Sequence, residues 1–338
     1  MGGFVLHRPR KMSEDLFKLL IGPAGEESEQ IFQRKFLVPR EKVEPKTLDR
    51  LTQMEILVYP LYFSGDTTEA ISQFNPVTVD GYQNRREYLN FKELRRRTPK
   101  DENLTLLFKG DKSHVIGPAI NRNGIEGFGH YGNRYFANTS LMSMLLYLHQ
   151  DFFGRDVHEF MDPFLGHGGS LISGVAYGAT HMVGVEIEHG NIVAARANLE
   201  HYLERERFVY GMSKKGDFSR YEIERRDGEL VIIEIYRDNS ILSAPDIAAE
   251  QKLSDYEIIS DIPWGHVKCR AHGRKRITTQ EDMVEFHTDL GEMLKRTESD
   301  RITLAQNRLA DIGLPEARRI PVSRLYNIVT YNLNGNSL

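Results

Sequence analysis

Cysteine and long apolar runs are nearly absent from this sequence of 338 residues. Its one cysteine, Cys269, cannot form a disulfide within the chain, and one thiolate cannot build a cysteine-rich zinc site. No apolar run reaches the roughly 18–20 residues of a membrane-spanning helix, and residues 1–15 lack the apolar core of a secretory signal. We therefore expect a soluble, cytoplasmic protein with no membrane partner.

A strong net charge and clusters of metal ligands are also missing. The net charge is −4, which by itself indicates no nucleic-acid partner, and the 12 histidines form no H-E-x-x-H pair, so we expect no metal site. Residues 1–150 hold 21 basic and 18 acidic side chains, and the totals of 44 and 48 leave 23 and 30 for residues 151–338. The two halves therefore carry +3 and −7, which is compatible with different roles.

The first 120 residues give short, mixed patterns that predict a small α+β domain. Residues 51–63 contain a β-rich run that Pro60 interrupts, as expected of an edge strand or a bulge, and the run LTLLF at 104–108 predicts another strand. Residues 84–100 predict a helix that ends in an arginine cluster at 95–97. Cations interact favourably with the C-terminal end of a helix, so the arginines could simply stabilise this helix. Arginines interleaved with aromatic residues also bind RNA phosphates, so a role in RNA binding is the alternative.

From residue 139 onward, helix and strand patterns alternate. The sequence predicts helices at 139–153, 170–179 and 190–206, and strands at 157–164, 181–188, 256–265, 300–306 and 324–333. This alternation is typical of βαβ units, in which helices cover a parallel sheet. Residues 205–255 break the rhythm and predict an inserted β-hairpin that turns at Arg226-Asp227-Gly228.

The residues that could bind a ligand lie near the strand predicted at 157–164. Asp162 follows the strand pattern and opens a loop that contains Gly166, Gly168 and Gly169 before the next helix. Glycines let the backbone approach a ligand closely and leave amide groups free at the helix N-terminus. The second strand ends in Glu186, 24 positions after Asp162. A carboxylate at this spacing can accept two hydrogen bonds from a ribose, so the set predicts an adenosine cofactor.

Two adenosine cofactors suit this geometry, and the loop distinguishes them. The segment GHGGSL at 166–171 has glycine at the first and third positions of the dinucleotide pattern G-x-G-x-x-G, but Leu171 stands at the sixth. Asp162 would repel the pyrophosphate of a dinucleotide, whereas it would attract the ammonium and sulfonium of S-adenosylmethionine. We therefore expect S-adenosylmethionine as the cofactor.

The segments DPFLGHGGSLI and GVEIE resemble the cofactor motifs of class I S-adenosylmethionine-dependent methyltransferases, especially those that act on exocyclic amines of nucleobases. These enzymes then have the motif [DN]-x-P-[YFW], which this chain supplies at 261–264 as DIPW, followed by glycine. The D-x-P-aromatic-G form is similar to the tRNA guanine 2-amino methyltransferases associated with THUMP domains. The resemblance covers about residues 135–338, and no THUMP domain is recognised in residues 1–110.

The resemblance implies a set of cofactor-binding residues. Asp238, which follows the strand pattern VIIEIYR, matches the acidic residue that lies near the adenine amine in this family, although an ordinary Asp-Asn turn explains it equally well. The cofactor-binding residues implied are Asp162, Pro163, Phe164, Gly166, His167, Gly168, Gly169, Glu186, Ile187, Asp238 and Asn239.

The DIPW motif also makes chemical sense without the resemblance. An aromatic amine is a poor nucleophile because its lone pair is delocalised into the ring. If its two N–H groups donate to the Asp261 carboxylate and to the Ile262 carbonyl, which Pro263 turns inward, the lone pair is directed at the methyl group. Trp264 would stack on the extruded base, a contact that contributes about 1–3 kcal/mol. A strand-ending turn with a packed tryptophan is the alternative interpretation.

We thus predict an α/β protein with two domains. A smaller α+β domain at 1–120 precedes a Rossmann-like, seven-stranded class I methyltransferase domain at about 125–338, and this second domain contains an insertion at about 205–255. The predicted reaction is methyl transfer to the exocyclic amine of a nucleobase in RNA, with the 2-amino group of guanosine in tRNA favoured. A DNA adenine (6-amino) methyltransferase and a non-catalytic nucleotide-binding scaffold are the alternatives. The first domain would hold the RNA through Arg85, Arg86, Arg95, Arg96 and Arg97.

Overall fold

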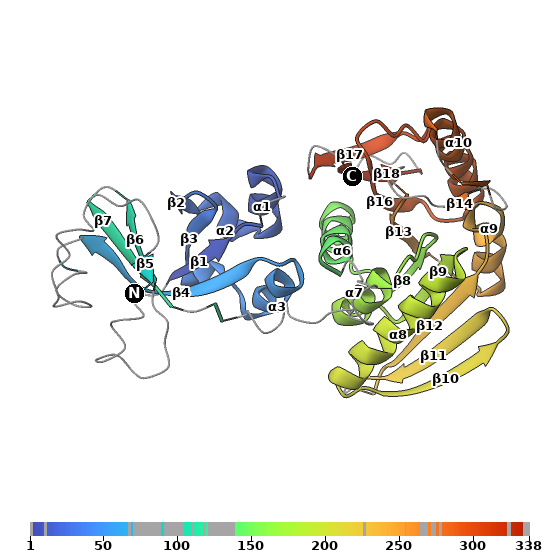
Figure 1. Ribbon diagram of the computed structural model, residues 1–338, viewed down its shortest axis with the longest axis horizontal. Coiled ribbons are helices and arrows are strands. Elements are labelled where there is room, and N and C mark those ends of the chain that lie inside the picture. The colour runs from blue at the N-terminus through green and yellow to red at the C-terminus, as the bar shows by residue number, and fades with distance from the viewer. Residues whose placement is uncertain are drawn as a thin grey trace. The chain divides into compact units, whose positions relative to one another are not determined.

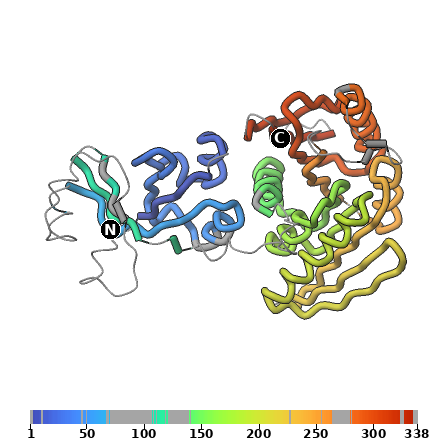
Figure 2. Tube along the Cα trace, in the orientation of Figure 1, coloured from blue at the N-terminus to red at the C-terminus, as the bar shows by residue number. Residues whose placement is uncertain are grey.

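The computed structural model of the chain divides into two compact units, residues 1–126 and 127–338, and we treat each by itself (Figure 1, Figure 2). The residues that the structure describes are 3–9, 12–66, 69, 89–90, 105–109, 111–117, 119–120, 139–225, 228–253, 255–263, 270–271, 275–276, 279–322 and 326–333.

The first unit is built on an antiparallel sheet with the strand order β2-β3-β1-β4-β7-β6-β5. In α1 the Ser13 side chain accepts from the Leu16 amide at 3.2 Å, and Phe17 packs against Phe36 of the sheet with ring centroids 4.7 Å apart. The strands are β1 (Gly3–His7), β2 (Glu29–Phe32), β3 (Lys35–Pro39), β4 (Leu57–Asp66), β5 (Leu89–Asn90), β6 (Thr105–Lys109) and β7 (Lys112–Ile116). The helices are α1 (Glu14–Leu20), α2 (Pro23–Glu26), α3 (Pro45–Gln53) and the 3₁₀ turn η1 (Arg40–Lys42).

Pro60 lies in an interior strand, directly before a bulge, and not at an edge of the sheet. β4 lies between β1 and β7, and its register with β7 shifts between Leu61 and Phe63. Pro60 has no amide hydrogen to donate, but its carbonyl accepts from the Gly117 amide at 2.9 Å. The predicted bulge is therefore confirmed, and the predicted edge is wrong.

The helix predicted over 84–100 is wrong where the structure describes it. Leu89 and Asn90 form β5, which pairs with Leu106 and Thr105 of β6. Pairing with a strand distant in the sequence overrides the local helical pattern. The five arginines predicted to contact RNA, at positions 85, 86 and 95–97, lie outside the described residues.

The second unit contains a mixed sheet with the strand order β10-β11-β12-β9-β8-β13-β16-β18-β17. Its helices are α6 (Thr139–Phe153), α7 (Gly169–Tyr177), α8 (His189–Arg205), α9 (Ser240–Glu250) and α10 (Gln280–Arg296). The strands of this sheet are β8 (Glu159–Asp162), β9 (His181–Glu186), β10 (Val209–Lys215), β11 (Phe218–Glu224), β12 (Leu230–Arg237), β13 (Glu257–Asp261), β16 (Arg301–Asn307), β17 (Glu316–Pro321) and β18 (Tyr326–Asn332). A separate pair consists of β14 (Arg270–Ala271) and β15 (Lys275–Arg276).

The alternation predicted from the sequence is confirmed in this unit. β12, β9, β8, β13 and β16 run parallel, while β18 and β17 complete one side antiparallel. α6, α7 and α8 lie on one face of the sheet, and α9 and α10 pack together on the other (Figure 1). The connecting helices therefore bring the carboxyl ends of the parallel strands to one edge.

Within the described residues, this sheet has nine strands where seven were predicted, because a hairpin extends one side. β10 and β11 form an antiparallel pair that adds to β12, with Gly216 in the left-handed region (φ 61°) at the turn. The predicted turn near Gly228 connects β11 with β12. Within 205–255 only β10 and β11 are added strands, since β12 and α9 continue the parallel alternation.

The core beside the site lies between the sheet and the pair α9 and α10. Ile258 of β13, Leu290 of α10 and Leu304 of β16 are fully buried, each worth about 1.5–3 kcal/mol of transfer free energy. α10 begins with a reciprocal cap in which Thr279 and Asp282 accept from each other's amides at 3.1 and 3.0 Å. This core fixes the position of the strand that carries the DIPW motif.

Candidate cofactor and catalytic site

Four predicted site residues lie where neighbouring parallel strands end. Asp162 ends β8, Glu186 ends β9, Asp238 follows β12 and Asp261 ends β13. Because these strands are adjacent in the order β12-β9-β8-β13, their carboxyl ends meet at one edge of the sheet. Ligands of open α/β sheets bind at this kind of edge.

Asp162 connects the glycine loop to the strand of the DIPW motif. The carboxylate is buried, and its Oδ1 accepts from the Phe164 amide at 3.0 Å and from the Ser260 hydroxyl of β13 at 2.5 Å. Burial raises the pKa of Asp162, while hydrogen bonds from Ser170, Ser260 and the Phe164 amide act in the opposite direction. These donors are neutral, so the ionised form of the Asp162 carboxylate would attract a cationic ligand group.

The glycine loop is held against β9 and α8. Gly166 and Gly168 have φ values of 54° and 83°, which favour glycine. The Leu165 amide donates to the Val185 carbonyl at 3.0 Å, and the Asn198 side chain of α8 donates to the His167 carbonyl at 3.0 Å. The loop conformation is therefore fixed by backbone contacts on both sides.

Glu186 closes this loop from the end of β9. Its Oε2 accepts from the Gly166 amide at 3.0 Å and its Oε1 from the Glu188 amide at 2.7 Å. Burial raises the pKa of Glu186, and these amides together with Asn191 act against the rise. Each carboxylate oxygen can accept more than one hydrogen bond, so Glu186 keeps capacity for ribose hydroxyls. Pro163 is buried, and Phe164 and Ile187 are partly exposed beside it.

Asp238 and Asn239 form a turn and a helix cap. Oδ1 of Asp238 accepts from the Asn239 amide at 2.7 Å, and Oδ1 of Asn239 accepts from the Ile241 amide at 3.2 Å, which caps α9. The Asp238 amide donates to the Glu186 carbonyl at 3.1 Å, so the turn adjoins the end of β9. The Asn239 Nδ2 is buried and has no hydrogen-bond partner within the described part of the chain.

The DIPW motif begins at the last residue of β13. Asp261 is partly exposed, whereas the Ile262 side chain is buried in the core and its amide donates to the Ala305 carbonyl of β16 at 3.1 Å. Pro263 is partly exposed, and Trp264 lies outside the described residues. The buried Ile262 thus fixes the backbone between Asp261 and Pro263.

Two contributors to this edge were not predicted. Ser260 supplies the hydroxyl that joins β13 to Asp162, and its signal was a polar residue within the buried run YEIIS. Phe286 of α10 packs edge-on against Phe164 of the loop, with ring centroids 5.6 Å apart and planes at 67°. No local pattern indicates the Phe286 contact, because it depends on how α10 packs on the sheet.

The residues of this edge fit S-adenosylmethionine. Among the described residues, a β-carbon built on Gly166 would meet only the Phe164 carbonyl oxygen, at 3.9 Å, so no described group fills that side of the loop. Beside it stand the carboxylates of Asp162 and Glu186, which suit a cationic methionine portion and a ribose. Among the described residues, no group of three or more His, Cys, Asp or Glu side chains is placed to hold a metal ion.

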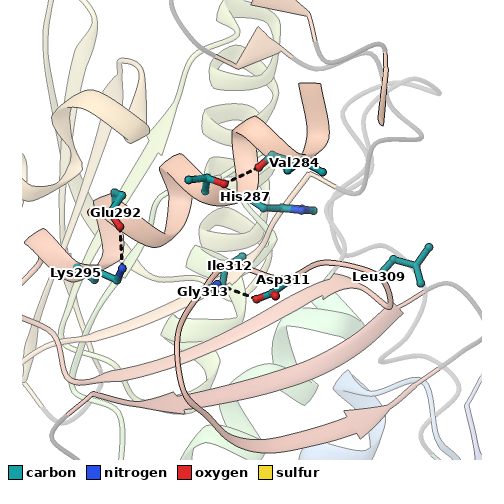
Figure 3. Close-up of a pocket in the computed structure, with 9 residues that line it drawn as sticks. Val284, His287, Glu292, Lys295, Leu309, Asp311, Ile312 and Gly313 are labelled. Atoms are coloured by element: carbon teal, nitrogen blue, oxygen red, sulfur yellow. Dashed lines mark hydrogen bonds and ion pairs between the residues drawn. The ribbon is translucent and has the colours of Figure 1, made fainter. Parts of the chain in front are cut away.

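A separate cavity of about 320 Å³ lies between α10 and the segment that joins β16 to β17 (Figure 3). Val284 and His287 line it from α10, and Leu309, Asp311 and Ile312 line it from the opposite segment. Burial lowers the pKa of His287, and the nearby Asp311 acts against this. None of the predicted site residues that the structure describes lines this cavity.

No described helix combines the length and the apolar character needed to cross a membrane.

Comparison with known proteins shows similarity at the level of structure. No family model matches the sequence, and no curated protein matches it. The structure is similar to TrmN from Thermus thermophilus, with a TM-score of 0.55 and 13% identity over 98% of this chain and 100% of that chain. Two further matches are the rRNA methyltransferase aviRa from Streptomyces viridochromogenes (TM-score 0.40, 15% identity, 61% and 89% covered) and the ribosomal protein L11 methylase from Lactobacillus delbrueckii subsp. bulgaricus (0.33, 13%, 57% and 79%).

The TrmN match has a TM-score above 0.5, and at 13% identity it shows the fold alone. The fold is mixed α/β and similar to methyltransferase folds. At the level of the fold, this likeness agrees with the resemblance to class I S-adenosylmethionine-dependent methyltransferases that the motifs indicate, and the activity stays a prediction.

Proposed function

We propose that the chain transfers a methyl group from S-adenosylmethionine to the exocyclic amine of a nucleobase in RNA, the 2-amino group of guanosine in tRNA being the favoured target. The second unit would carry the reaction, with the parallel strands and β18 and β17 as its seven-stranded core, and the first unit would hold the RNA. The choice of guanosine in tRNA rests on the D-x-P-aromatic-G form of residues 261–265.

The cofactor would be held by the edge described above. Asp162 and the loop amides would face the methionine portion of the cofactor, and Glu186 would bind its ribose. Asp238 and Asn239 would lie beside its adenine, to which the buried Asn239 Nδ2 could donate a hydrogen bond. When bound, S-adenosylmethionine supplies an electrophilic methyl group on a sulfonium.

The catalytic residues would be Asp261, Ile262, Pro263 and Trp264. The Asp261 carboxylate and the Ile262 carbonyl would accept the two amine hydrogens and so direct the nitrogen lone pair at the methyl carbon. As the new N–C bond forms, the C–S bond breaks and its electron pair returns to sulfur, and one amine proton is then released. Positioning of this kind supplies several kcal/mol of the barrier reduction, about 7–11 at most.

The observation that best supports this proposal is the hydrogen bond between Ser260 and Asp162, 2.5 Å long. It ties the cofactor loop to the residue just before the DIPW motif, so the predicted cofactor side chain and the predicted catalytic side chain belong to one connected structure.

The test is methylation of tRNA by Asp261→Asn protein, with Asp246→Asn as the matched control on an exposed position of α9. Asparagine keeps the size of the side chain but removes the charge, so we expect methyl transfer to fall about 10²–10⁴-fold while cofactor affinity stays unchanged. Mass spectrometry of nucleosides from tRNA incubated with labelled cofactor measures the product, and calorimetry measures cofactor binding.

Two outcomes would contradict the proposal. Methyl incorporation into duplex DNA but not into tRNA would favour a DNA adenine methyltransferase. Cofactor binding without any methylated nucleic acid, together with an Asp261→Asn variant that behaves like the original protein, would favour a non-catalytic scaffold.

A further inference from the structure

Two large apolar side chains are exposed at the cavity between α10 and the segment that joins β16 to β17. Leu309 is 90% exposed, the highest value for a large hydrophobic residue in the described part of the chain, and Val284 is 60% exposed. Both line the cavity (Figure 3). Exposed apolar side chains around a hollow are typical of a ligand-binding site.

A buried polar atom without a partner lies in the same cavity. His287 is 7% exposed, and its Nε2 has no hydrogen-bond partner among the residues that the structure describes. Figure 3 shows its ring between α10 and the segment that carries Asp311. Burial lowers the pKa of His287, so the ring is neutral at neutral pH and Nε2 can donate or accept. A buried ring nitrogen left unpaired costs free energy, which a bound ligand would recover.

The walls of this cavity are held in place by close contacts. A β-carbon built on Gly291 of α10 would lie 2.0 Å from the Ile312 carbonyl oxygen, so glycine allows the helix and the opposite segment to pack this closely. The Asp311 Oδ1 accepts from the Gly313 amide at 2.9 Å, and Gly313 has a φ of 67°, which favours glycine. The cavity is therefore a fixed part of the fold.

The cavity lies at the same edge of the sheet as the DIPW motif. β13 and β16 are parallel neighbours in which Asp261 pairs with Ala305, and the segment that joins β16 to β17 follows the carboxyl end of β16. On α10, Phe286 precedes His287 and packs against Phe164 of the glycine loop. The cavity is thus near the proposed reaction site.

The lining of the cavity suits a nucleobase and not a phosphate. Asp311 carries a negative charge, and the charge of Lys295 is paired with Glu292 at 2.8 Å, so the lining repels an anion. The amino group of a base can donate to a carboxylate, and its ring nitrogens can bond to the Nε2 of His287. The flat face of a base would cover Leu309. A volume of about 320 Å³ is at the small end of ligand pockets, which suits a single base.

We infer that this cavity binds a second, unpaired base of the RNA substrate, one that carries an exocyclic amine. The inference rests on the proposed function, which supplies RNA as the partner. Asp311 accepts from the amine, His287 bonds to the edge of the ring, and Leu309 packs on its face. Unpaired bases are the part of an RNA that proteins read in a sequence-specific way, so this contact would select the site of methylation.

The first experiment compares Asp311→Asn with Asp246→Asn in the full chain. Both substitutions remove one negative charge from an exposed position, and asparagine at 311 can still accept from the Gly313 amide. Fluorescence anisotropy of labelled tRNA gives the dissociation constants. Loss of a negative charge alone leaves the affinity for a polyanion unchanged or raises it, as we expect for Asp246→Asn. A lost hydrogen bond to the base has the opposite sign, so we expect Asp311→Asn to bind tRNA about tenfold more weakly.

The second experiment tests the other two contacts. Leu309→Ser removes the apolar contact at an exposed position, and Leu230→Ser is the matched control at a position that is 53% exposed on β12. His287→Phe keeps a ring against Phe286 but removes the ring nitrogens. We expect Leu309→Ser and His287→Phe to weaken tRNA binding by about fivefold or more, with no effect of Leu230→Ser. Unchanged cofactor affinity, measured by calorimetry, shows that the variants are folded.

The inference is overturned if Asp311→Asn and Leu309→Ser bind tRNA as tightly as their controls, or if the original protein binds no tRNA. Weaker binding by Leu309→Ser alone would also overturn it, because a base with an amine must contact Asp311. Nucleoside mass spectrometry on the same samples separates the two proposals. If the variants weaken tRNA binding but the original protein methylates none, the proposed function fails and this inference stands. If tRNA is methylated and the variants bind like their controls, the inference alone fails.

Discussion

At the scale of single residues, Asp162 organises the site through its hydrogen bonds but is a buried acidic group with little solvent around it. It organises the loop through the Phe164 amide and joins β13 through Ser260. Yet it is 2% exposed, and its hydrogen bonds come from neutral groups, so a negative charge there is held with little solvent. Such a residue is expected where a cationic ligand group completes the electrostatics.

Asp162→Asn should therefore stabilise the protein without cofactor. Because burial raises the pKa of Asp162 in the folded state, its favourable contribution is complete only below the pKa of the unfolded chain and is lost as pH rises through the folded value. Asparagine does not titrate and can still accept from Phe164 and Ser260. We expect a melting temperature a few degrees higher at about pH 7, a difference near zero at about pH 4, and loss of cofactor binding.

Thermal unfolding at both pH values checks this, with Asp246→Asn as the exposed control. A gain in melting temperature that is the same at both pH values would show that the charge of Asp162 is not its cause.

Residue identities could be predicted at this edge, but their partners could not. Asp162 and Glu186 follow strand patterns directly, so their place at the strand ends was visible in the sequence. The contacts of Ser260 with Asp162 and of Phe286 with Phe164 join residues about a hundred positions apart, and they depend on strand order and helix packing. Sequence spacing carries no direct information about either.

At the scale of elements, the two units differ in how well their helices and strands can be predicted from the sequence. In the second unit the parallel strands contain short apolar runs, as in HMVGVE of β9, and most of these strands are separated along the sequence by helices. In the first unit the sheet is antiparallel, and β5 has only two residues, so its pairing with β6 overrides a local helical pattern. The strands β1 to β3 were not predicted, because each has only four or five residues and belongs to the same antiparallel sheet.

The start of α7 offers a test of how the loop is built. Gly168 has a φ of 83°, and a β-carbon there would lie 3.1 Å from the Cα and Cβ of Ala195 in α8. Gly168→Ala should therefore cost about 2–4 kcal/mol, from the left-handed conformation and from crowding against α8. Cofactor affinity should fall as well, because the loop amides shift.

Gly178→Ala at the other end of α7 is the matched control. Its φ is 99°, but nothing lies within 4 Å of the added β-carbon, so only the conformational cost of about 1–2 kcal/mol is expected. Urea unfolding measures both free energies, and calorimetry measures cofactor binding. If both substitutions cost the same, the contact between the loop and Ala195 is not what fixes the loop.

At the scale of the whole molecule, the two units each have a core of their own within the described residues. Val5, Ile31, Leu107 and Ile116 form a buried cluster in the first unit, while the core of the second unit lies between its sheet and the pair α9 and α10. The proposed cofactor edge belongs to the second unit, and the first unit is the one proposed to hold the RNA. Binding of RNA and binding of the cofactor should therefore be separable.

Calorimetry of the full chain tests this separation. Because each unit has its own core, we expect two unfolding transitions. S-adenosylmethionine at about 100 times its dissociation constant stabilises the unit that binds it by about 2.7 kcal/mol, which should raise one transition by roughly 5–10 °C and leave the other unchanged. A nicotinamide dinucleotide, whose pyrophosphate Asp162 repels, should shift neither transition. A single transition, or an equal shift of both by the cofactor, would show that the two cores unfold as one, and a shift by the dinucleotide would contradict the assignment of the cofactor.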